Sequence, residues 1–247
     1  MTTIYHIAYA PEAKILHLHF WGCNLMCRGC VRQKEIYDCH IGKTRDAVFE
    51  GGKKPEGKPM HFLDIAGVKN ILKEVTFSRV IFMGMEATLD PELPRLTELL
   101  HQEFHSYNVL LTNGLRLVPL EHVDEVCVSI KAYRDDIHQD YTRVSNKEIL
   151  RNFIKIYSSG KKLRTESVFI PDLIDCSEIE NIAKFIAGVD KSIPYRIDAY
   201  IPIDGSPWRR PTPQEMESAL GIARKYLTKV SCLTTDESVK PEVIRIF

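Results

Sequence analysis

The chain has 247 residues, of which 44% are hydrophobic and 27% are charged, a composition typical of a globular protein with one sizeable core. Its 33 basic residues balance 33 acidic residues, so no overall field favours nucleic acid or an anionic membrane as a partner. No apolar run approaches the roughly 18 residues of a membrane span, and the first residues lack the features of a signal peptide. We therefore expect a cytoplasmic protein that does not bind membranes.

Strand-like runs rich in β-branched and aromatic residues alternate with segments of helical period. The expected strands are residues 14–20, 79–84, 108–111, 125–130, 163–170, 195–201 and 244–247, and the expected helices are 64–75, 91–105, 147–157, 178–187 and 213–227. Six successive βα units require a parallel α/β sheet with right-handed crossovers, and at this length they fit a partial (βα)6 TIM-like barrel. A doubly wound sheet is less favoured, because no G-x-G-x-x-G follows the first strand.

We expect a single domain, with a core at about 14–228 and a short C-terminal extension at 229–247. Two stretches rich in turn residues, 42–59 and 201–213, are expected to be surface loops on the side where such a barrel places its chemistry. The first is either a lid or a solvated insertion. In the second, Trp208, Arg209 and Arg210 either contact a partner or form an ordinary exposed turn.

Three cysteines, Cys23, Cys27 and Cys30, lie in the stretch CNLMCRGC directly after the first expected strand. Their spacing also fits one buried face of a helix, but Gly22 and Gly29 disfavour helix, so a compact loop is expected. The remaining cysteines are scattered singly and are expected to be buried apolar residues: Cys39, Cys127, Cys176 and Cys232.

The clustered thiols suit an iron–sulfur cluster, because iron in such clusters prefers thiolate ligands. Three thiolates on a four-iron cube leave one iron open. Zinc is the main alternative, although a structural zinc site usually takes four ligands in two pairs, and no partner pair exists elsewhere in the sequence.

The spacing C-x3-C-x2-C after a first strand resembles the signature of radical S-adenosylmethionine (radical SAM) enzymes. The resemblance implies that Cys23, Cys27 and Cys30 bind one 4Fe-4S cluster and that SAM chelates the open iron. It also implies that a low-potential electron donor, ferredoxin or flavodoxin, drives reductive cleavage of SAM to methionine and a 5'-deoxyadenosyl radical, which abstracts hydrogen from a substrate.

Two further segments match the family at the ends of later strands. MGMEATLDP resembles its G-G-E segment, with Gly84 and Glu86 retained and Met85 in place of the second glycine. Glu86 is then expected to accept hydrogen bonds from the SAM ammonium, although a solvated glutamate is the ordinary alternative. TNG at 112–114 also matches, which adds Thr112 and Asn113 to the cofactor site; it fits a simple strand-ending turn as well.

The stretch VCVSIKAYRDDIHQDYTRVSN at 126–146 resembles radical SAM enzymes that activate glycyl radical enzymes, of the pyruvate formate-lyase activating enzyme type. In that group D-x-K leads to D-x-x-x-H and then to T-G-V-S-N. The matching residues here are Lys131, Asp135 or Asp136, His138, Thr142, Val144, Ser145 and Asn146. The resemblance implies that the substrate is the backbone glycine of a glycyl radical enzyme.

Several residues depart from the family pattern at the cofactor site. Gly29 replaces the aromatic residue that usually precedes the third cysteine, and no D-G-P-G segment precedes the first strand. Leu111 and Ser129 stand where two aspartates of activating enzymes help to hold a monovalent cation beside SAM. Without those acids, Lys131 is expected to pair with the SAM carboxylate directly.

On the fifth expected strand, Glu166 stands where relatives carry an arginine that contacts the cofactor. Arg164 lies on the same strand face and either takes over that role or forms a structural pair with Glu166. His17 and His19 share a face of the first expected strand, where they either handle a substrate or its proton or are structural.

Two alternatives to a glycyl radical substrate remain. The protein could be a radical SAM enzyme that acts on a small molecule or a peptide during cofactor or protein maturation. It could also be a non-catalytic metal-binding or redox-sensing protein, which the altered cofactor pocket would favour.

Overall fold

The computed structural model describes residues 1–30, 59–203, 205–234 and 242–247. Within these residues nine strands form one sheet, in the spatial order β8-β7-β6-β5-β4-β3-β2-β1-β9. Neighbouring strands from β2 to β8 are parallel, whereas β1 pairs antiparallel with both β2 and β9. The strands are β1 Ile4–Ala10, β2 Ile15–Phe20, β3 Arg79–Gly84, β4 Tyr107–Thr112, β5 Glu125–Ser129, β6 Lys162–Phe169, β7 Tyr195–Ala199, β8 Val230–Leu233 and β9 Ile244–Arg245.

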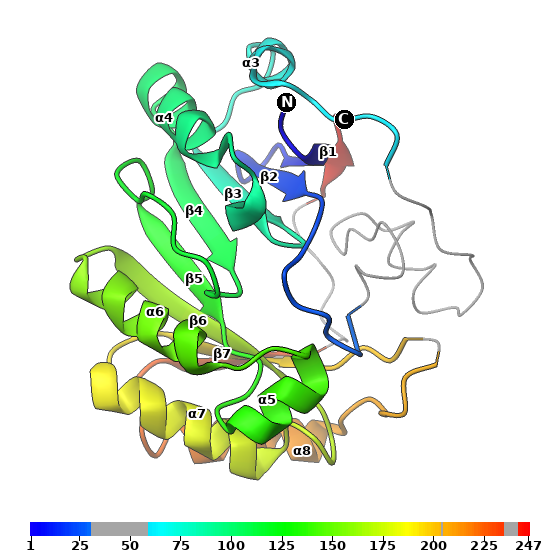
Figure 1. Cartoon of the computed structure of the whole chain (residues 1–247), viewed down its shortest axis with the longest axis vertical. Coiled ribbons are helices and arrows are strands. Elements are labelled where there is room, and N and C mark those ends of the chain that lie inside the picture. Colours follow the sequence, from blue (N-terminus) through cyan, green and yellow to red (C-terminus); the bar gives the residue numbers. More distant parts are fainter. Residues whose placement is uncertain (31–58, 204, 235–241) are drawn as a thin grey trace.

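The helices occupy the connections between the parallel strands. They are α3 Ile65–Leu72, the short 3-10 helix η1 Ala87–Leu89, α4 Leu93–Phe104, α5 Asp135–Thr142, α6 Lys147–Ser158, α7 Cys176–Val189 and α8 Pro213–Ala223. Figure 1 shows α4, α6 and α7 along one side of the curved sheet, whereas the segment that follows β2 runs along the other side towards α5. The predicted α/β arrangement with a mostly parallel sheet is confirmed.

The two faces of the sheet differ in polarity, as β6 shows. Leu163 and Phe169 are buried on the face that the helices cover, whereas Arg164 and Glu166 are half-buried on the other face. The face that carries Arg164 and Glu166 is the concave face of the sheet. Because side chains alternate along a strand, polar residues gather on this face at the carboxyl half of the sheet. Active sites of barrels of this kind lie at that end.

Strand β1 and helix α5 were not predicted from the sequence. The prediction that the first strand begins at residue 14 is wrong, because β1 precedes it and returns antiparallel to β2 through residues 11–14. Helix α5 was also missed, since the stretch at 135–142 was interpreted only as a motif. The last helix begins where its sequence predicts, because Thr212 and Glu215 form a capping box at the start of α8.

The expected loop at 42–59 lies almost entirely outside the described residues, so its interpretation as a lid or an insertion stays open. In the described part of the chain, no helix combines the length and the apolar character needed to span a bilayer.

A glycine at the end of β3 allows two strands to meet beside the site. Gly84 has φ +117°, and a Cβ at this position would lie 2.5 Å from the backbone nitrogen of Phe20 and 2.7 Å from its oxygen. Gly22, in the segment after β2, has φ +102°, but a Cβ there would meet no atom within 4 Å. Both residues have a positive φ, which favours glycine. Only at Gly84 would an added Cβ also collide with a neighbouring strand.

We predict that Gly22→Ala lowers the free energy of unfolding by about 1–3 kcal/mol through backbone strain. Gly84→Ala should cost about 1–3 kcal/mol more, because the backbone of Phe20 cannot move aside like a flexible side chain. Urea denaturation of both variants measures the difference. Equal losses for the two variants would contradict the close approach of β3 to β2.

Candidate functional site

The three clustered cysteines lie on a loop that follows β2, as predicted. Cys27 is buried, and Cys23 and Cys30 are half-buried. The loop has no helix or strand within it. Two backbone contacts hold it against the end of α5: the Met26 N–H donates to the Thr142 carbonyl at 2.9 Å, and the Arg28 N–H donates to the Tyr141 carbonyl at 3.0 Å.

The three thiols share one electrostatic environment. Burial raises the pKa of Cys27 to about 12; Lys131 opposes this shift, and Cys30 and Cys23 add to it. Burial likewise raises the pKa of Cys23, with further contributions from Glu86 and Cys30. The apoprotein therefore favours the neutral thiols of Cys23 and Cys27, and forming these two thiolates requires additional positive charge, which a metal centre would supply.

Lys131 places a cation beside these sulfurs. It follows β5, and its Nζ donates a hydrogen bond to Ser129 Oγ at 2.6 Å. Burial lowers its pKa, but the combined effect of Cys27, Glu166, Cys30 and Cys23 is larger and holds the pKa above the ordinary value. Lys131 and Ser129 thus lie together at the end of β5, as the sequence pattern suggested.

Glu86 joins the ends of two strands to the cysteine loop. This carboxylate is 2% exposed. Its Oε1 accepts from Thr88 Oγ1 at 2.6 Å and from Thr112 Oγ1 at 2.7 Å, and its Oε2 accepts from the Asn113 N–H at 2.7 Å. Asn113 in turn donates from Nδ2 to Asn24 Oδ1 at 2.7 Å. Glu86 is therefore not a solvated glutamate, and much of its hydrogen-bonding capacity is used within the protein.

Met85 also contacts the cysteine loop. Its sulfur accepts a hydrogen bond from the Gly22 N–H at 3.2 Å, and its own N–H donates to the Phe20 carbonyl at 3.0 Å. The segment Gly84 to Glu86 thus supports the loop through both its backbone and its side chains.

The motif at 126–146 forms a second support for the loop. His138 Nδ1 lies 2.7 Å from the Val144 carbonyl, and Asp135 Oδ1 accepts from the Asn146 N–H at 2.9 Å. These contacts close the turn after α5, whose last residues, Tyr141 and Thr142, offer their carbonyls to the cysteine loop. The matching residues of this motif therefore act, at least in part, by shaping the support.

Arg164 does not pair with Glu166. Its Nε lies 2.6 Å from Glu125 Oε1, and its Nη1 lies 3.0 Å from Cys127 Sγ, towards the amino end of β5. Glu166 instead pairs with Arg196 at 2.8 Å. The structure thus brings Glu166 into the environment of Lys131, whereas the guanidinium of Arg164 is engaged elsewhere on the concave face.

Two residues of this face were missed by sequence reasoning. Arg196 Nε lies 2.7 Å from Asp198 Oδ1, so Arg196 joins Glu166 and Asp198 in one network. Burial raises the pKa of Asp198 despite the neighbouring Arg196. The alternation YRIDA in β7 was the available signal, because it places the two charges on one face of the strand.

Aromatic side chains from other parts of the chain surround Gly29. A Cβ at this position would lie 2.9 Å from Tyr200 Cε2 and 3.1 Å from the hydroxyl oxygen of Tyr141. Trp208 packs edge-on against both rings, at centroid distances of 5.7 Å from Tyr141 and 6.2 Å from Tyr200, and the Arg28 guanidinium lies over its ring. Trp208 is therefore part of the wall next to the cysteine loop.

His17 and His19 are both buried on β2, and the ring of His19 lies 4.9 Å from that of His6 on β1. On β2 they alternate with the core residues Leu16 and Leu18, so they point to the face opposite the one that these leucines share. Nothing in their geometry assigns them to a substrate.

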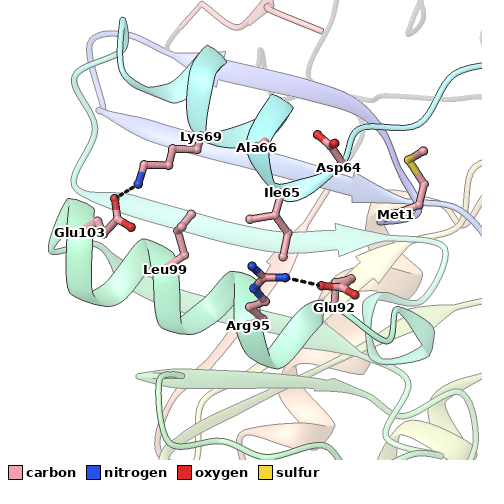
Figure 2. A pocket seen from close by; sticks show the side chains of 9 residues that line it. All are labelled: Met1, Asp64, Ile65, Ala66, Lys69, Glu92, Arg95, Leu99 and Glu103. Carbon is pink, nitrogen blue, oxygen red and sulfur yellow. Dashed lines mark ion pairs between the residues drawn. The ribbon is translucent and has the colours of Figure 1, made fainter.

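Among the described residues, no three His, Cys, Asp or Glu side chains converge on a point that could hold a single metal ion. A cavity of about 460 Å³ lies elsewhere, between α3 and α4, and includes none of the residues above (Figure 2). It is bordered by the ion pairs Lys69–Glu103 and Arg95–Glu92.

Comparison with known proteins places these features in a family. The model of the Radical SAM superfamily matches residues 18–186 of this chain. A Methanocaldococcus jannaschii protein provisionally named a glycyl-radical enzyme activating enzyme is 29% identical over 239 residues, which cover 93% of this chain and 83% of the relative.

Two solved structures share the fold. A radical SAM methyltransferase from Sphaerobacter thermophilus has a TM-score of 0.63 at 17% identity and is matched over 94% of this chain and 69% of its own. QueE from Escherichia coli has a TM-score of 0.58 at 15% identity over 95% of each chain. The predicted partial barrel of the radical SAM type is confirmed by these similarities.

We predict that Glu86→Gln destabilises the protein by about 1–3 kcal/mol, because the amide nitrogen would face hydrogen-bond donors in a buried position. Glu98→Gln, a change of the same chemistry on the exposed face of α4, should stay within about 0.5 kcal/mol of the wild type. Chemical denaturation measures both. If Glu86→Gln behaves like Glu98→Gln, Glu86 does not hold the two strand ends and the loop together.

Proposed function

This chain belongs to the radical SAM superfamily, and we propose that it uses one 4Fe-4S cluster and SAM to abstract hydrogen from the backbone glycine of a glycyl radical enzyme. The observation that carries the proposal is the position of Cys23, Cys27 and Cys30 on one loop beside Lys131. A low-potential donor, ferredoxin or flavodoxin, would supply the electron.

The residues present fit these cofactors. Three cysteines on a loop provide the soft ligands that iron prefers, and their burial matches a centre that must be kept from water. When bound, the cluster and SAM supply the electron transfer and the carbon-centred radical of the reaction. The residues of the chain bind and orient these cofactors and exclude solvent from them.

Lys131 is proposed to bind the carboxylate of SAM. Its charge is maintained in a half-buried position next to the cysteines, and Ser129 orients its ammonium. Because Leu111 and Ser129 stand where activating enzymes carry two aspartates, a monovalent cation has no acidic ligand at these two positions, and a lysine charge can replace it. Glu86 and Asn113 would fix the opposite side of the SAM site by holding the ends of β3 and β4.

The glycyl radical substrate is supported by the relative named above and by the motif at 126–146. A specific observation favours the second candidate, a charged small molecule or peptide. The concave face carries the ionic network of Glu166, Arg196 and Asp198, which a neutral backbone glycine would leave without a matching group. Deuterium transfer from candidate substrates into 5'-deoxyadenosine distinguishes the two candidates.

We predict that the reconstituted protein, reduced without oxygen in the presence of SAM, forms 5'-deoxyadenosine. A variant with Cys23, Cys27 and Cys30 all changed to Ala should form none, because it lacks the ligands of the cluster. Cys176→Ala, at a half-buried cysteine of α7, should match the wild type. Wild-type protein that carries its cluster but yields no 5'-deoxyadenosine would support a redox sensor instead of an enzyme.

We also predict that Lys131→Gln weakens SAM binding about 10- to 100-fold, because a hydrogen bond to a charged group contributes about 1.5–3 kcal/mol. Lys155→Gln, at an exposed position on α6, is the matched control and should leave the affinity unchanged. Equilibrium dialysis with the cluster-loaded variants measures the affinities. An unchanged affinity for Lys131→Gln would show that another group binds the carboxylate.

A further inference from the structure

Tyr141 brings a hydroxyl group into the cysteine loop. It lies in the last turn of α5 and is 4% exposed. Its hydroxyl oxygen lies 3.1 Å from the position that a Cβ would take at residue 29, between Cys27 and Cys30 in the sequence, and the hydroxyl oxygen of Tyr200 lies 3.0 Å from the same position. Any side chain at this position would compete with both hydroxyls for the same space.

The hydroxyl of Tyr141 makes no hydrogen bond within the described part of the chain. The neighbouring Tyr200 differs, because its hydroxyl donates to Ser206 Oγ at 2.6 Å. The Tyr141 hydroxyl is therefore available to donate a hydrogen bond to a bound group.

The surroundings of Tyr141 favour a donor role. Burial raises its pKa well above the ordinary value, and Cys27 and Cys30 raise it further, so the hydroxyl keeps its proton. The hydroxyl lies 3.1 Å from the position of a Cβ at Gly29, which stands between Cys27 and Cys30 in the sequence. The acceptor is therefore expected on this side of the loop.

The position of the ring is fixed by the backbone. The Tyr141 carbonyl accepts from the Arg28 N–H at 3.0 Å, and the ring packs edge-on against Trp208. The Arg28 side chain also pairs with Asp140, the residue before Tyr141. The hydroxyl is thus held in place before any cofactor binds, which lowers the entropy cost of the contact.

We propose that Tyr141 donates a hydrogen bond to a sulfur of the bound cluster, on the side of Cys27 and Cys30, and that Gly29 leaves the space for it. A hydrogen bond to sulfur stabilises the more negative, reduced cluster and so raises its reduction potential. Tyr141 is then a positioning residue that adjusts how readily the cluster accepts an electron. This inference rests on the proposed cluster and goes beyond its three ligands.

The test is an EPR-monitored redox titration of anaerobically reconstituted Tyr141→Phe, which keeps the ring and removes only the hydroxyl. We expect iron and sulfide contents equal to the wild type and a more negative midpoint potential. At a fixed solution potential, the ratio of reduced to oxidised cluster should fall several-fold. Tyr200→Phe, which removes a hydroxyl already bonded to Ser206, should leave the potential unchanged.

A loaded Tyr141→Phe variant with the wild-type potential would overturn the inference and leave the proposed function intact. Wild-type protein that takes up no iron and sulfide would overturn both. If Tyr141→Phe does not fold, Gly29→Ala is the second variant, because its methyl group would crowd the hydroxyls of Tyr141 and Tyr200, and Tyr200→Phe measures the contribution of the latter. That variant should shift the potential in the same direction, and no shift would again count against the role of Tyr141.

Discussion

The structure of this site depends on one constraint: three sulfur atoms must be held on an irregular loop in a partly buried position. A loop without its own helix or strand cannot fix side chains by internal hydrogen bonds, so its neighbours must do so. One support comes from Glu86, which connects the ends of β3 and β4 through Asn113 to Asn24. The other comes from the carbonyls of Tyr141 and Thr142 at the end of α5.

The same constraint explains the charges around the loop. Burial disfavours the thiolate forms of Cys23 and Cys27, and Lys131 is the cation that opposes this effect most directly at Cys27. Next to Lys131, the network of Glu166, Arg196 and Asp198 keeps further charges paired on the concave face. Paired charges at the carboxyl end of a parallel sheet provide a polar surface without a large net field.

The sequence predicted what is local and missed what depends on distant contacts. The bounds of β3 were predicted correctly because a short run of β-branched and aromatic residues ends at a glycine with positive φ. The cysteine loop was predicted correctly because Gly22 and Gly29 disfavour the helix that the cysteine spacing would also fit. Helix α5 was missed because its eight residues contain few apolar side chains, and contacts with the cysteine loop support it.

The pairs Arg164–Glu125 and Glu166–Arg196 were missed because they depend on the register of neighbouring strands. The position of Tyr141 beside Gly29 likewise depends on how α5 packs against the loop.

The central claim is that the three cysteines bind a four-iron cluster with one iron left open for SAM. Mössbauer spectroscopy of the protein reconstituted with ⁵⁷Fe tests this most directly, since it distinguishes the individual irons. The account predicts one iron in four with distinct parameters, which change when SAM is added, whereas the other three keep theirs. Four equivalent irons, or a spectrum that SAM leaves unaltered, would contradict it.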